Sequence, residues 1–341
     1  MSRRGLAFAL LCVVCIVVAV AAVGSAALRT REQDRKAEQA AAVVRPTVAR
    51  LLEQGQSFVL FRSLDRADGS TYGRLALAPL DGDAAGKRLL AGQKCERVDL
   101  GAGRGLCLGT ADPAGFTAKI LDGTLKETGS VRLAGVPSRT RISPDGRYGA
   151  VTSFVTGHSY ADVGQFSTAS TIIDLARGRK IADLEKDFAI TVDGKRKTAR
   201  DRNFWGVTFS RDGDTFYATM ATGGKTYLIK ASLRRRTGAS IHENVECPSL
   251  SPDETRIGYK KAVGHDPPIW RFHVLDLATG RETALAETQP LDDQLEWLDD
   301  ENVLYRSGES TWTVPADGSG APRRWLAAGD SPAIVRAAPA T

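Results

Sequence analysis

The sequence predicts an all-β fold, a six-bladed β-propeller, that follows an N-terminal transmembrane or signal helix and a short helical stalk. The first observation is a turn that occurs four times between apolar segments, with an Asp at its centre: Asp145, Asp212, Asp253 and Asp300. Pro or Gly beside most of these Asp residues favours the backbone angles of a tight hairpin turn. A strand–turn–strand unit that repeats in this way is typical of propeller blades.

The second observation sets the number of blades. Corners that contain Asp would follow the third strand of each blade, and they occur at residues 80–82, 121–123, 173–178, 275–280 and 316–318, with a degenerate copy at 230–233. They are roughly 40 to 60 residues apart, close to the length of a four-stranded blade. Six corners therefore predict six blades.

The third observation concerns how the ring closes. Residues 58–63 resemble the second strand of a blade without an innermost strand before it, whereas residues 330–335 resemble an innermost strand without a blade of its own. We expect the C-terminal strand to complete the first blade beside the strand at Phe58, because this arrangement leaves no open sheet edge. The propeller then covers residues 57–336, and residues 337–341 form a tail.

The N-terminal residues 1–30 contain an uncharged run from Gly5 to Leu28, after Arg3 and Arg4. About 20 apolar residues suffice for a helix to cross a bilayer, so this run is long enough. One interpretation is a cleaved signal peptide with a processing site at residues 24–27. The other is an uncleaved signal anchor, which we favour because signal-peptide cores are usually about 7–15 residues long. The propeller is then exported and held at the cell membrane by a single pass, or secreted if the segment is cleaved.

The following residues, 31–56, are rich in Ala, Glu, Gln and Arg, which favours a helix. We interpret them as a stalk between the membrane and the propeller. Pro46 is expected to interrupt this helix, because proline lacks the amide donor that a helix interior needs. Leu51 and Leu52 can dock the end of the stalk on the propeller.

Two cysteines flank a Gly-rich hairpin. If this hairpin is centred on Gly101, Cys95 and Cys107 face each other across two antiparallel strands and can form a disulfide. An exported chain permits such a bond, and the alternative is a pair of buried free thiols. Cys247 is then left over, and we expect it to be buried and inert.

Composition and motif searches exclude several classes of function. The chain is 42% hydrophobic and 25% charged, with a net charge of +6, and its basic clusters are short, at residues 195–197, 234–236 and 323–324. No aromatic residues are interleaved with these clusters, so nucleic acid is not an expected partner. The four His residues lack metal-site spacing, and no P-loop, dinucleotide fingerprint or EF-hand loop is present. We therefore expect no metal and no cofactor.

The candidate site residues follow from the repeat. The residue seven positions before each turn Asp starts an innermost strand and should face the mouth of the central channel, and two further residues neighbour this ring: Ser138, Trp205, Glu246 and Asp293, with Arg139 and Asn203. Polar and aromatic side chains that converge on a channel indicate a ligand or peptide site. The alternative is that channel mouths are polar simply because they are wet. Insertions at residues 156–167 and 186–202 are further candidates, because such segments commonly carry binding.

Several segments resemble the TolB-like propeller repeat, in particular Ser143-Pro144-Asp145-Gly146 and Ser251-Pro252-Asp253. The chain is more specifically similar to exported TolB-like translocation proteins of unassigned function, through the segments at residues 95–97, 204–209 and 246–253. This resemblance implies a six-bladed propeller that contacts proteins in the cell envelope. The separate N-terminal domain of TolB is replaced here by the apolar segment and stalk, so the partners of TolB do not transfer.

Three functions follow as hypotheses. The first is a membrane-tethered, extracytoplasmic propeller that binds an envelope protein or peptide through its channel face and its two insertions. The second is a hydrolase or lyase at the channel mouth, with Glu246, Asp293 and His158 as candidates. The third is a sensor of a small molecule or sugar, which requires an enclosed pocket near Trp205. The sequence predicts no oligomeric state.

Overall fold

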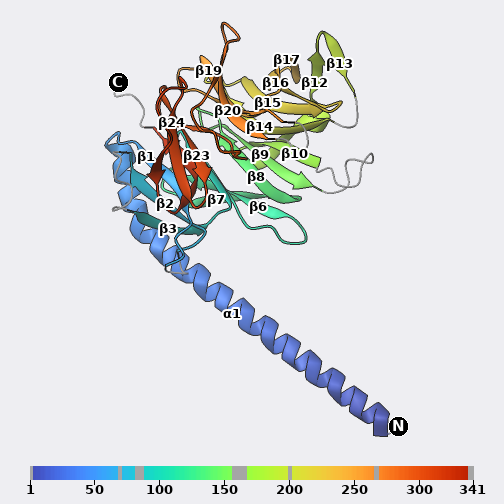
Figure 1. Ribbon diagram of the computed structural model, residues 1–341. Helices are drawn as coiled ribbons and strands as arrows, with labels where there is room; N and C mark the ends of the chain where they lie inside the picture. The colour runs from blue at the N-terminus through green and yellow to red at the C-terminus, as the bar shows by residue number, and fades with distance from the viewer. Residues whose placement is uncertain are drawn as a thin grey trace.

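The computed structural model describes residues 3–67, 71–80, 88–155, 167–198, 202–264 and 269–336 (Figure 1). Within α1, the side chains of residues 3–9, 26, 27, 29–31, 33, 34, 37, 38 and 40 are not described either. Residues 156–166 of the predicted insertion 156–167, which include His158, lie outside the described residues. The same holds for residues 81 and 82 of the predicted corner 80–82 and for the predicted tail.

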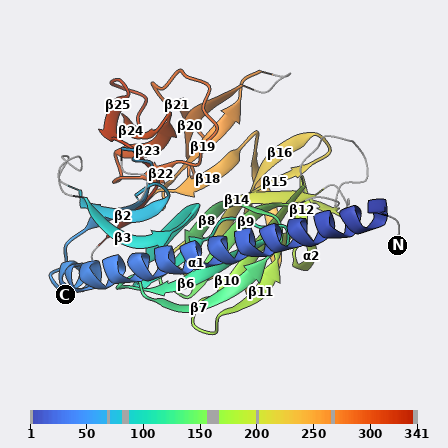
Figure 2. The same cartoon turned by 90° about the horizontal axis from the view of Figure 1, so that it is seen from below.

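Six antiparallel blades form the body of the molecule, as predicted (Figures 1 and 2). Blade 1 contains β26 (Gly329–Val335), β1 (Phe58–Ser63), β2 (Arg74–Pro79) and β3 (Leu89–Lys94). Blade 2 contains β4 (Arg97–Gly101), β5 (Arg104–Leu108), β6 (Phe116–Asp122) and β7 (Glu127–Leu133). Blade 3 contains β8 (Val136–Ile142), β9 (Tyr148–Val155), β10 (Ser167–Asp174) and β11 (Arg179–Asp183).

The remaining blades follow in chain order. Blade 4 contains β14 (Asn203–Phe209), β15 (Thr215–Thr222), β16 (Lys225–Ser232) and β17 (Thr237–Glu243). Blade 5 contains β18 (Glu246–Leu250), β19 (Arg256–Ala262), β20 (Trp270–Asp276) and β21 (Glu282–Ala284). Blade 6 contains β22 (Glu296–Trp297), β23 (Asn302–Ser307), β24 (Ser310–Pro315) and β25 (Arg323–Leu326).

The predicted closure of the ring is confirmed. Strand β26 pairs antiparallel with β1, so that Val335 lies opposite Phe58 and Gly329 lies opposite Ser63. The C-terminal strand thus supplies the innermost strand of blade 1 and ties the two ends of the propeller together.

The predicted Asp turns join the innermost strand of a blade to the second strand. In blade 3, the hydroxyl of Ser143 and the amide of Arg147 donate to the carboxylate of Asp145 at 2.6 and 3.0 Å. Gly146 adopts a φ of +68°, which only glycine reaches without strain. Ser251 and Asp253 form the same contact in blade 5. These turns lie together at one end of the central channel, which we call the turn end.

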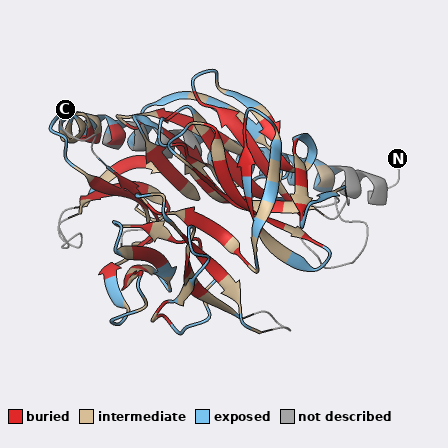
Figure 3. Ribbon diagram, turned by 90° about the horizontal axis from the view of Figure 1, so that it is seen from above, coloured by how far each residue is buried: buried red, intermediate tan, exposed pale blue. Residues whose placement is uncertain are grey.

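Apolar side chains fill the seams between neighbouring blades, so burial is concentrated in the middle of each sheet (Figure 3). The seam between blades 3 and 4 contains Ile172, Phe204, Phe216, Met220 and Ile229. Burying such side chains contributes roughly 25 cal/mol per Å² of apolar surface, so the seams hold the blades rigidly around the channel.

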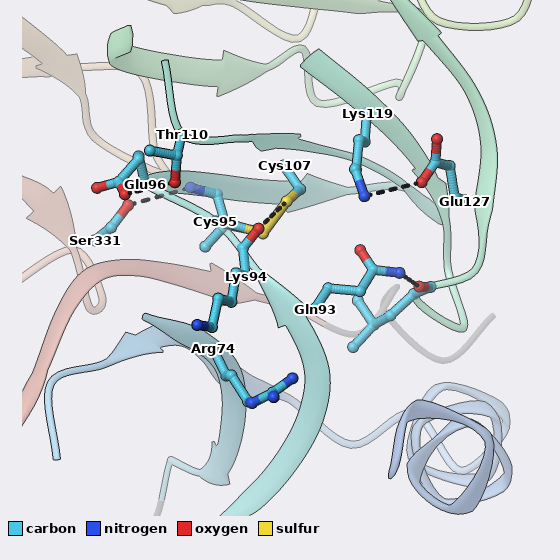
Figure 4. Close-up of a disulfide and its surroundings, with 12 residues drawn as sticks. Arg74, Gln93, Lys94, Cys95, Glu96, Cys107, Thr110, Lys119, Glu127 and Ser331 are labelled. Carbon is cyan, nitrogen blue, oxygen red and sulfur yellow. Dashed lines mark hydrogen bonds and ion pairs between the residues drawn. A yellow bond between two sulfur atoms is a disulfide. The ribbon is translucent and has the colours of Figure 1, made fainter. Parts of the chain in front are cut away.

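The predicted disulfide is confirmed: Cys95 and Cys107 are bonded, with 5.3 Å between their Cα atoms (Figure 4). The expected register was wrong, because the hairpin turns at Ala102 and Gly103, both with positive φ, and pairs Val98 with Cys107. A two-residue turn with two positive φ angles matches the twist of its strands and fixes this register. Cys95 therefore reaches Cys107 from the segment that precedes β4.

Helix α1 (Arg3–Glu53) continues through Pro46, so the expected interruption was wrong (Figure 1). Val44 and Val48, on either side of Pro46, are buried against the core of blades 1 and 2, and Leu51 and Leu52 pack there as predicted. A proline inside a helix costs about 3 kcal/mol, and burial of these side chains offsets a loss of that size.

The N-terminal part of α1 extends away from the propeller (Figure 1). Its described apolar side chains are exposed, for example Leu10 by 64% and Val23 by 69%. No helix formed by the described residues combines the length and the apolar character needed to cross a membrane. The predicted run from Gly5 to Leu28 lies within α1, and the side chains of its residues 5–9, 26 and 27 are not described.

The insertion at residues 186–202 extends blade 4. It begins within α2 (Leu184–Asp187) and contains β12 (Ala189–Val192) and β13 (Lys195–Lys197). Strand β12 pairs in parallel with β17, so the sheet of blade 4 has six strands and the hairpin forms its outer edge. Ile190 and Val192 are buried in the seam with blade 3, which places this insertion at the rim of the ring rather than at the channel.

Candidate functional site

Three cavities follow one another along the central channel. The mouth cavity, at the end where the innermost strands begin, has a volume of about 510 Å³ and is lined by Arg97, Val136, Pro137, Ser138, Arg139, Thr152, Phe154, Thr168, Trp205, Glu246, Cys247, Lys260, Trp270 and Asp292. The throat cavity, of about 290 Å³, shares Arg97, Arg139 and Asp292 with it. The turn-end cavity, of about 680 Å³, includes the turn residues Pro144 and Pro252.

A β-bulge interrupts each of three innermost strands at the mouth. The pairing register shifts between Pro137 and Arg139 in β8, between Trp205 and Thr208 in β14, and between Glu246 and Ser249 in β18. A bulge bends its strand and redirects the side chains beside it. Three neighbouring blades are thus modified at the same level and direct side chains into one cavity.

The bulge in β14 depends on a glycine. Gly206 has a φ of +65°, and a Cβ atom at this position would lie 2.6 Å from the Cα of Cys247. Cys247 itself has a φ of +50° and is buried, and it lines the mouth cavity. Glycine is therefore required where β14 and β18 approach each other.

The predicted site residues divide into three groups. Four of them line the mouth cavity: Ser138, Arg139, Trp205 and Glu246. Asp293 lines the throat cavity instead and accepts a hydrogen bond from the amide of Arg306 at 2.8 Å. Asn203 lines neither cavity; its side-chain oxygen accepts a hydrogen bond from the amide of Thr168 at 3.0 Å and so ties blade 4 to blade 3.

One wall of the mouth is held by a buried lysine. Lys260 is 3% exposed, forms an ion pair with Asp292 and lies 3.8 Å from Glu246. Its ammonium group also lies 4.6 Å from the ring centroid of Trp270, whose indole nitrogen donates to Glu246 at 2.9 Å. These contacts fix the position of the Trp270 ring. Sequence reasoning missed Lys260 and Trp270, because they lie on β19 and β20, outside the repeat position used to find the site.

Two arginines lie side by side where the mouth meets the throat. Arg97 Nε and Arg139 Nη1 donate to the same main-chain oxygen, that of Ser138, at 2.7 and 3.0 Å. Arg97 also donates to the carbonyl oxygen of Glu96 at 2.8 Å. Burial lowers the pKa of the Arg97 guanidinium, and the neighbouring charge of Arg139 lowers it further. The segment at residues 95–97, which carries the resemblance to TolB-like proteins, is the sequence signal for Arg97. The repeat position that predicts the other site residues does not mark Arg97.

An ion pair stands between the throat and the turn end. Arg141 and Glu296 are 2.7 Å apart, and both line the throat cavity and the turn-end cavity. Burial raises the pKa of the Glu296 carboxyl and also that of the Asp99 carboxyl, which accepts the amide of Ile142 at 2.7 Å. This group of buried charges separates the channel into two ends.

The geometry gives no support to the hydrolase or lyase hypothesis. Glu246 lines the mouth cavity and Asp293 the throat cavity, and each is held by a different structural contact. His158 lies outside the described residues. Among the described residues, no group of three His, Cys, Asp or Glu side chains is placed to hold a metal ion.

An apolar rim surrounds one side of the mouth. Val136 and Phe154, which pair across β8 and β9, are 55% and 41% exposed. Val263 and Ile269, at the tip of the β19–β20 hairpin that carries Trp270, are also exposed. Apolar side chains that gather on the surface beside a cavity indicate an interaction site.

Comparisons with known proteins bear on the fold. No protein-family model and no curated protein matches the chain. Among solved structures, the chain is similar to TolB from Acinetobacter baumannii, with 17% identity and a TM-score of 0.55 over 82% of this chain and 66% of TolB. It therefore spans slightly less than two thirds of the TolB chain.

Two further structures share the architecture. A chain of a nidogen–laminin complex has 10% identity and a TM-score of 0.54 over 83% of this chain and 99% of its own length. A protein of unknown function from Desulfotomaculum acetoxidans has 8% identity and a TM-score of 0.50 over 83% of this chain and all of its own. At such identities the likeness shows the fold. With its six blades and its C-terminal closing strand, the chain has a TolB-like β-propeller fold.

Proposed function

We propose that the protein is a membrane-tethered, extracytoplasmic scaffold that binds an envelope protein or peptide at the channel mouth. The observation that carries this proposal is the mouth cavity of about 510 Å³ beside the exposed side chains of Val263 and Ile269. A small ligand would be enclosed by the cavity and would need no apolar rim, whereas a polypeptide covers both.

The rigid ring suits this role. The ring is closed by β26, and its seams are packed, so the mouth is preformed and binding need not order it. The TolB-like fold favours a role in protein contact, although the likeness does not identify a partner. Blades 3, 4 and 5 contribute most of the mouth, and we place the main contact with the partner there.

Two features support the proposed location. The described side chains of α1 from Leu10 to Val23 are apolar and largely exposed. Exposure of such a surface to water is unfavourable, because burying it would stabilise the helix. Insertion into a bilayer would cover them. The Cys95–Cys107 disulfide fits an oxidising compartment outside the cytoplasm.

A second candidate function is the sensing of a small molecule or sugar. The cavity lined by Trp205 and Trp270 favours it, because aromatic walls with a few polar groups are typical of small-ligand sites. This function predicts binding that depends on the cavity and not on the exposed rim side chain of Ile269, which does not line the cavity.

The test is partner capture from membranes with a C-terminally tagged full chain. We compare the wild type with Trp205→Ala and Asp293→Ala. We use Ile269→Ala on the rim and Ile241→Ala on β17 as a matched pair, because the two side chains are 42% and 45% exposed. We expect Trp205→Ala and Ile269→Ala to lose the partner and Ile241→Ala to retain it.

Two outcomes would overturn parts of the proposal. If all variants retain the same partners, the site is not at the mouth. If Trp205→Ala loses binding while Ile269→Ala retains it, the small-molecule function is favoured. The intact mass of the recovered protein decides whether the N-terminal segment is cleaved, and extraction of the membranes at high pH decides whether the chain is integral to them.

A further inference from the structure

We propose that the mouth cavity binds the C-terminal carboxylate of a peptide whose last side chain is apolar, and that Arg97 and Arg139 hold this carboxylate. The inference rests on the proposed function and names the chemistry of the partner at the same site.

The first support is the incomplete pairing of the two arginines. Among the described residues, no carboxylate oxygen lies within ion-pair distance of Arg97, whose hydrogen bonds go to two carbonyl oxygens. The nearest carboxylates to Arg139, those of Asp292 and Asp293, are both 4.0 Å away. The Nε atom of Arg139 is buried without a hydrogen-bond partner. Arg139 thus keeps an unpaired donor next to a second guanidinium group that has no carboxylate partner, and two such groups side by side form a site for a carboxylate.

The neighbouring cations differ from this pair. Lys260 is bound to Asp292, Arg141 lies 2.7 Å from Glu296, and Arg62 lies 3.0 Å from Glu96. Each of these cations has a carboxylate at hydrogen-bond distance, so each is already neutralised. Arg97 and Arg139 differ from these cations in this respect, and they lie where the mouth cavity meets the throat cavity.

The second support is the apolar wall beside the arginines. Trp205, Trp270 and Phe154 line the same cavity. A side chain next to the bound carboxylate would pack between these rings and lose its contact with water. An apolar last residue therefore places its carboxylate against the arginine pair and its side chain against the aromatic wall.

The third support explains why the peptide should end here. Beyond the arginine pair lies the smaller throat cavity of about 290 Å³, which is lined by Asp293 and Asp330, and the Arg141–Glu296 pair lies behind it. A chain that entered the mouth could not continue past these charges without displacing a buried ion pair, which is strongly unfavourable. An N-terminal ammonium group would meet two guanidinium groups, so the carboxyl end is the one that fits.

The experiment measures binding of two probes to the full chain in detergent by calorimetry: N-acetyl-Ala-Ala-Leu-Phe with a free carboxylate, and the same peptide with a C-terminal amide. We expect the free acid to bind at least tenfold more tightly than the amide. We expect Arg139→Met and Arg97→Met to remove this preference while leaving the affinity for the amide within about twofold. Arg132→Met, on the outer strand of blade 2, should change neither affinity.

A conservative variant covers the case in which Arg139→Met does not fold. Arg139→Lys keeps the charge and loses the planar fork, so it should retain part of the preference for the acid. Equal binding of acid and amide, equal weakening of both by the Arg→Met variants, or no binding of either peptide would overturn the proposal. The proposed function would still stand if capture of the membrane partner continued to depend on Trp205.

Discussion

The two ends of the central channel are built by the same strands and differ in how their residues are used. At the turn end, the residue three before each turn Asp is apolar in every blade that carries the turn: Ile142, Phe209, Leu250 and Trp297. The residues seven before the same Asp are all different: Ser138, Trp205 and Glu246 line the mouth, and Asp293 lines the throat. The repeated residues form the blade, and the residues that vary between blades form the site.

The hydrogen bonds show the same contrast. Turn-end side chains bond within their own turn, as Ser143 does to Asp145, or to the turn of the next blade, as Ser210 does to Glu254 at 2.9 Å. At the mouth, by contrast, Arg139 keeps a buried donor without a partner. A polar group left in this state is costly to bury unless a ligand pairs with it. The comparison therefore assigns stability to the turn end and binding to the mouth.

The largest expected effect comes from a substitution that disrupts the backbone of the mouth. Gly206→Ala would place a Cβ atom 2.6 Å from the Cα of Cys247 at a φ of +65°, and we expect it to lower the free energy of unfolding by about 3 to 4 kcal/mol. Gly213→Ala, in the turn between β14 and β15, has a φ of +68° and a nearest contact at 3.5 Å, so it should cost only about 1 to 2 kcal/mol. Urea unfolding of both variants measures the difference. Equal losses would show that the close approach of β14 and β18 is not required.

The next effect concerns the disulfide that anchors the start of blade 2. Cys95 and Cys107 are 12 residues apart, so replacing both by Ala should lower the free energy of unfolding by about 3 kcal/mol through the loss of loop-closure entropy. A reducing agent should destabilise the wild type by a similar amount and leave the double variant unchanged. Unfolding by urea with and without reductant measures this. A wild type that is insensitive to reductant would contradict the expectation.

A smaller effect tests the turn end through its pH dependence. Burial alone would raise the pKa of Asp253, but hydrogen bonds from Ser251 and Thr255 and the charge of Arg256 outweigh it and lower that pKa to about 2. Because the pKa is lower in the folded state than in the unfolded state, the stabilisation is present above about pH 4 and is lost as the pH falls toward 2.

Asp253→Asn should therefore cost about 1 kcal/mol at pH 7, since one third of the side chain is exposed to screening solvent. The difference in unfolding free energy between variant and wild type should stay constant above pH 5 and shrink below pH 4. A difference that is the same at pH 7 and pH 3 would rule out the carboxylate as its source.

The repeat explains why the fold could be predicted and the site only in part. The turn Asp residues and the corners follow the chain period, so they identified six blades and the closing strand. Ser138, Trp205 and Glu246 obey the same period and reach the mouth. Asn203 does not, because it satisfies a backbone amide of blade 3 instead of facing the channel.

Other features depend on tertiary contacts that a local pattern does not contain. Lys260 and Trp270 reach the mouth from the second and third strands of blade 5, where no repeat position marked them. Pro46 remains inside α1 because the residues around it are buried against blades 1 and 2. The register of the Cys95–Cys107 hairpin depends on a turn at Ala102, which is not a residue that usually adopts a positive φ.

The most direct test of the contrast between the two ends is photo-crosslinking in intact membranes, with a photoreactive amino acid placed at Val136 on the rim of the mouth or at Arg211 beside the turn-end cavity. The account predicts a discrete adduct from position 136 that excess N-acetyl-Ala-Ala-Leu-Phe suppresses, and no such adduct from position 211. An adduct from position 211 but none from position 136 would contradict the assignment of binding to the mouth.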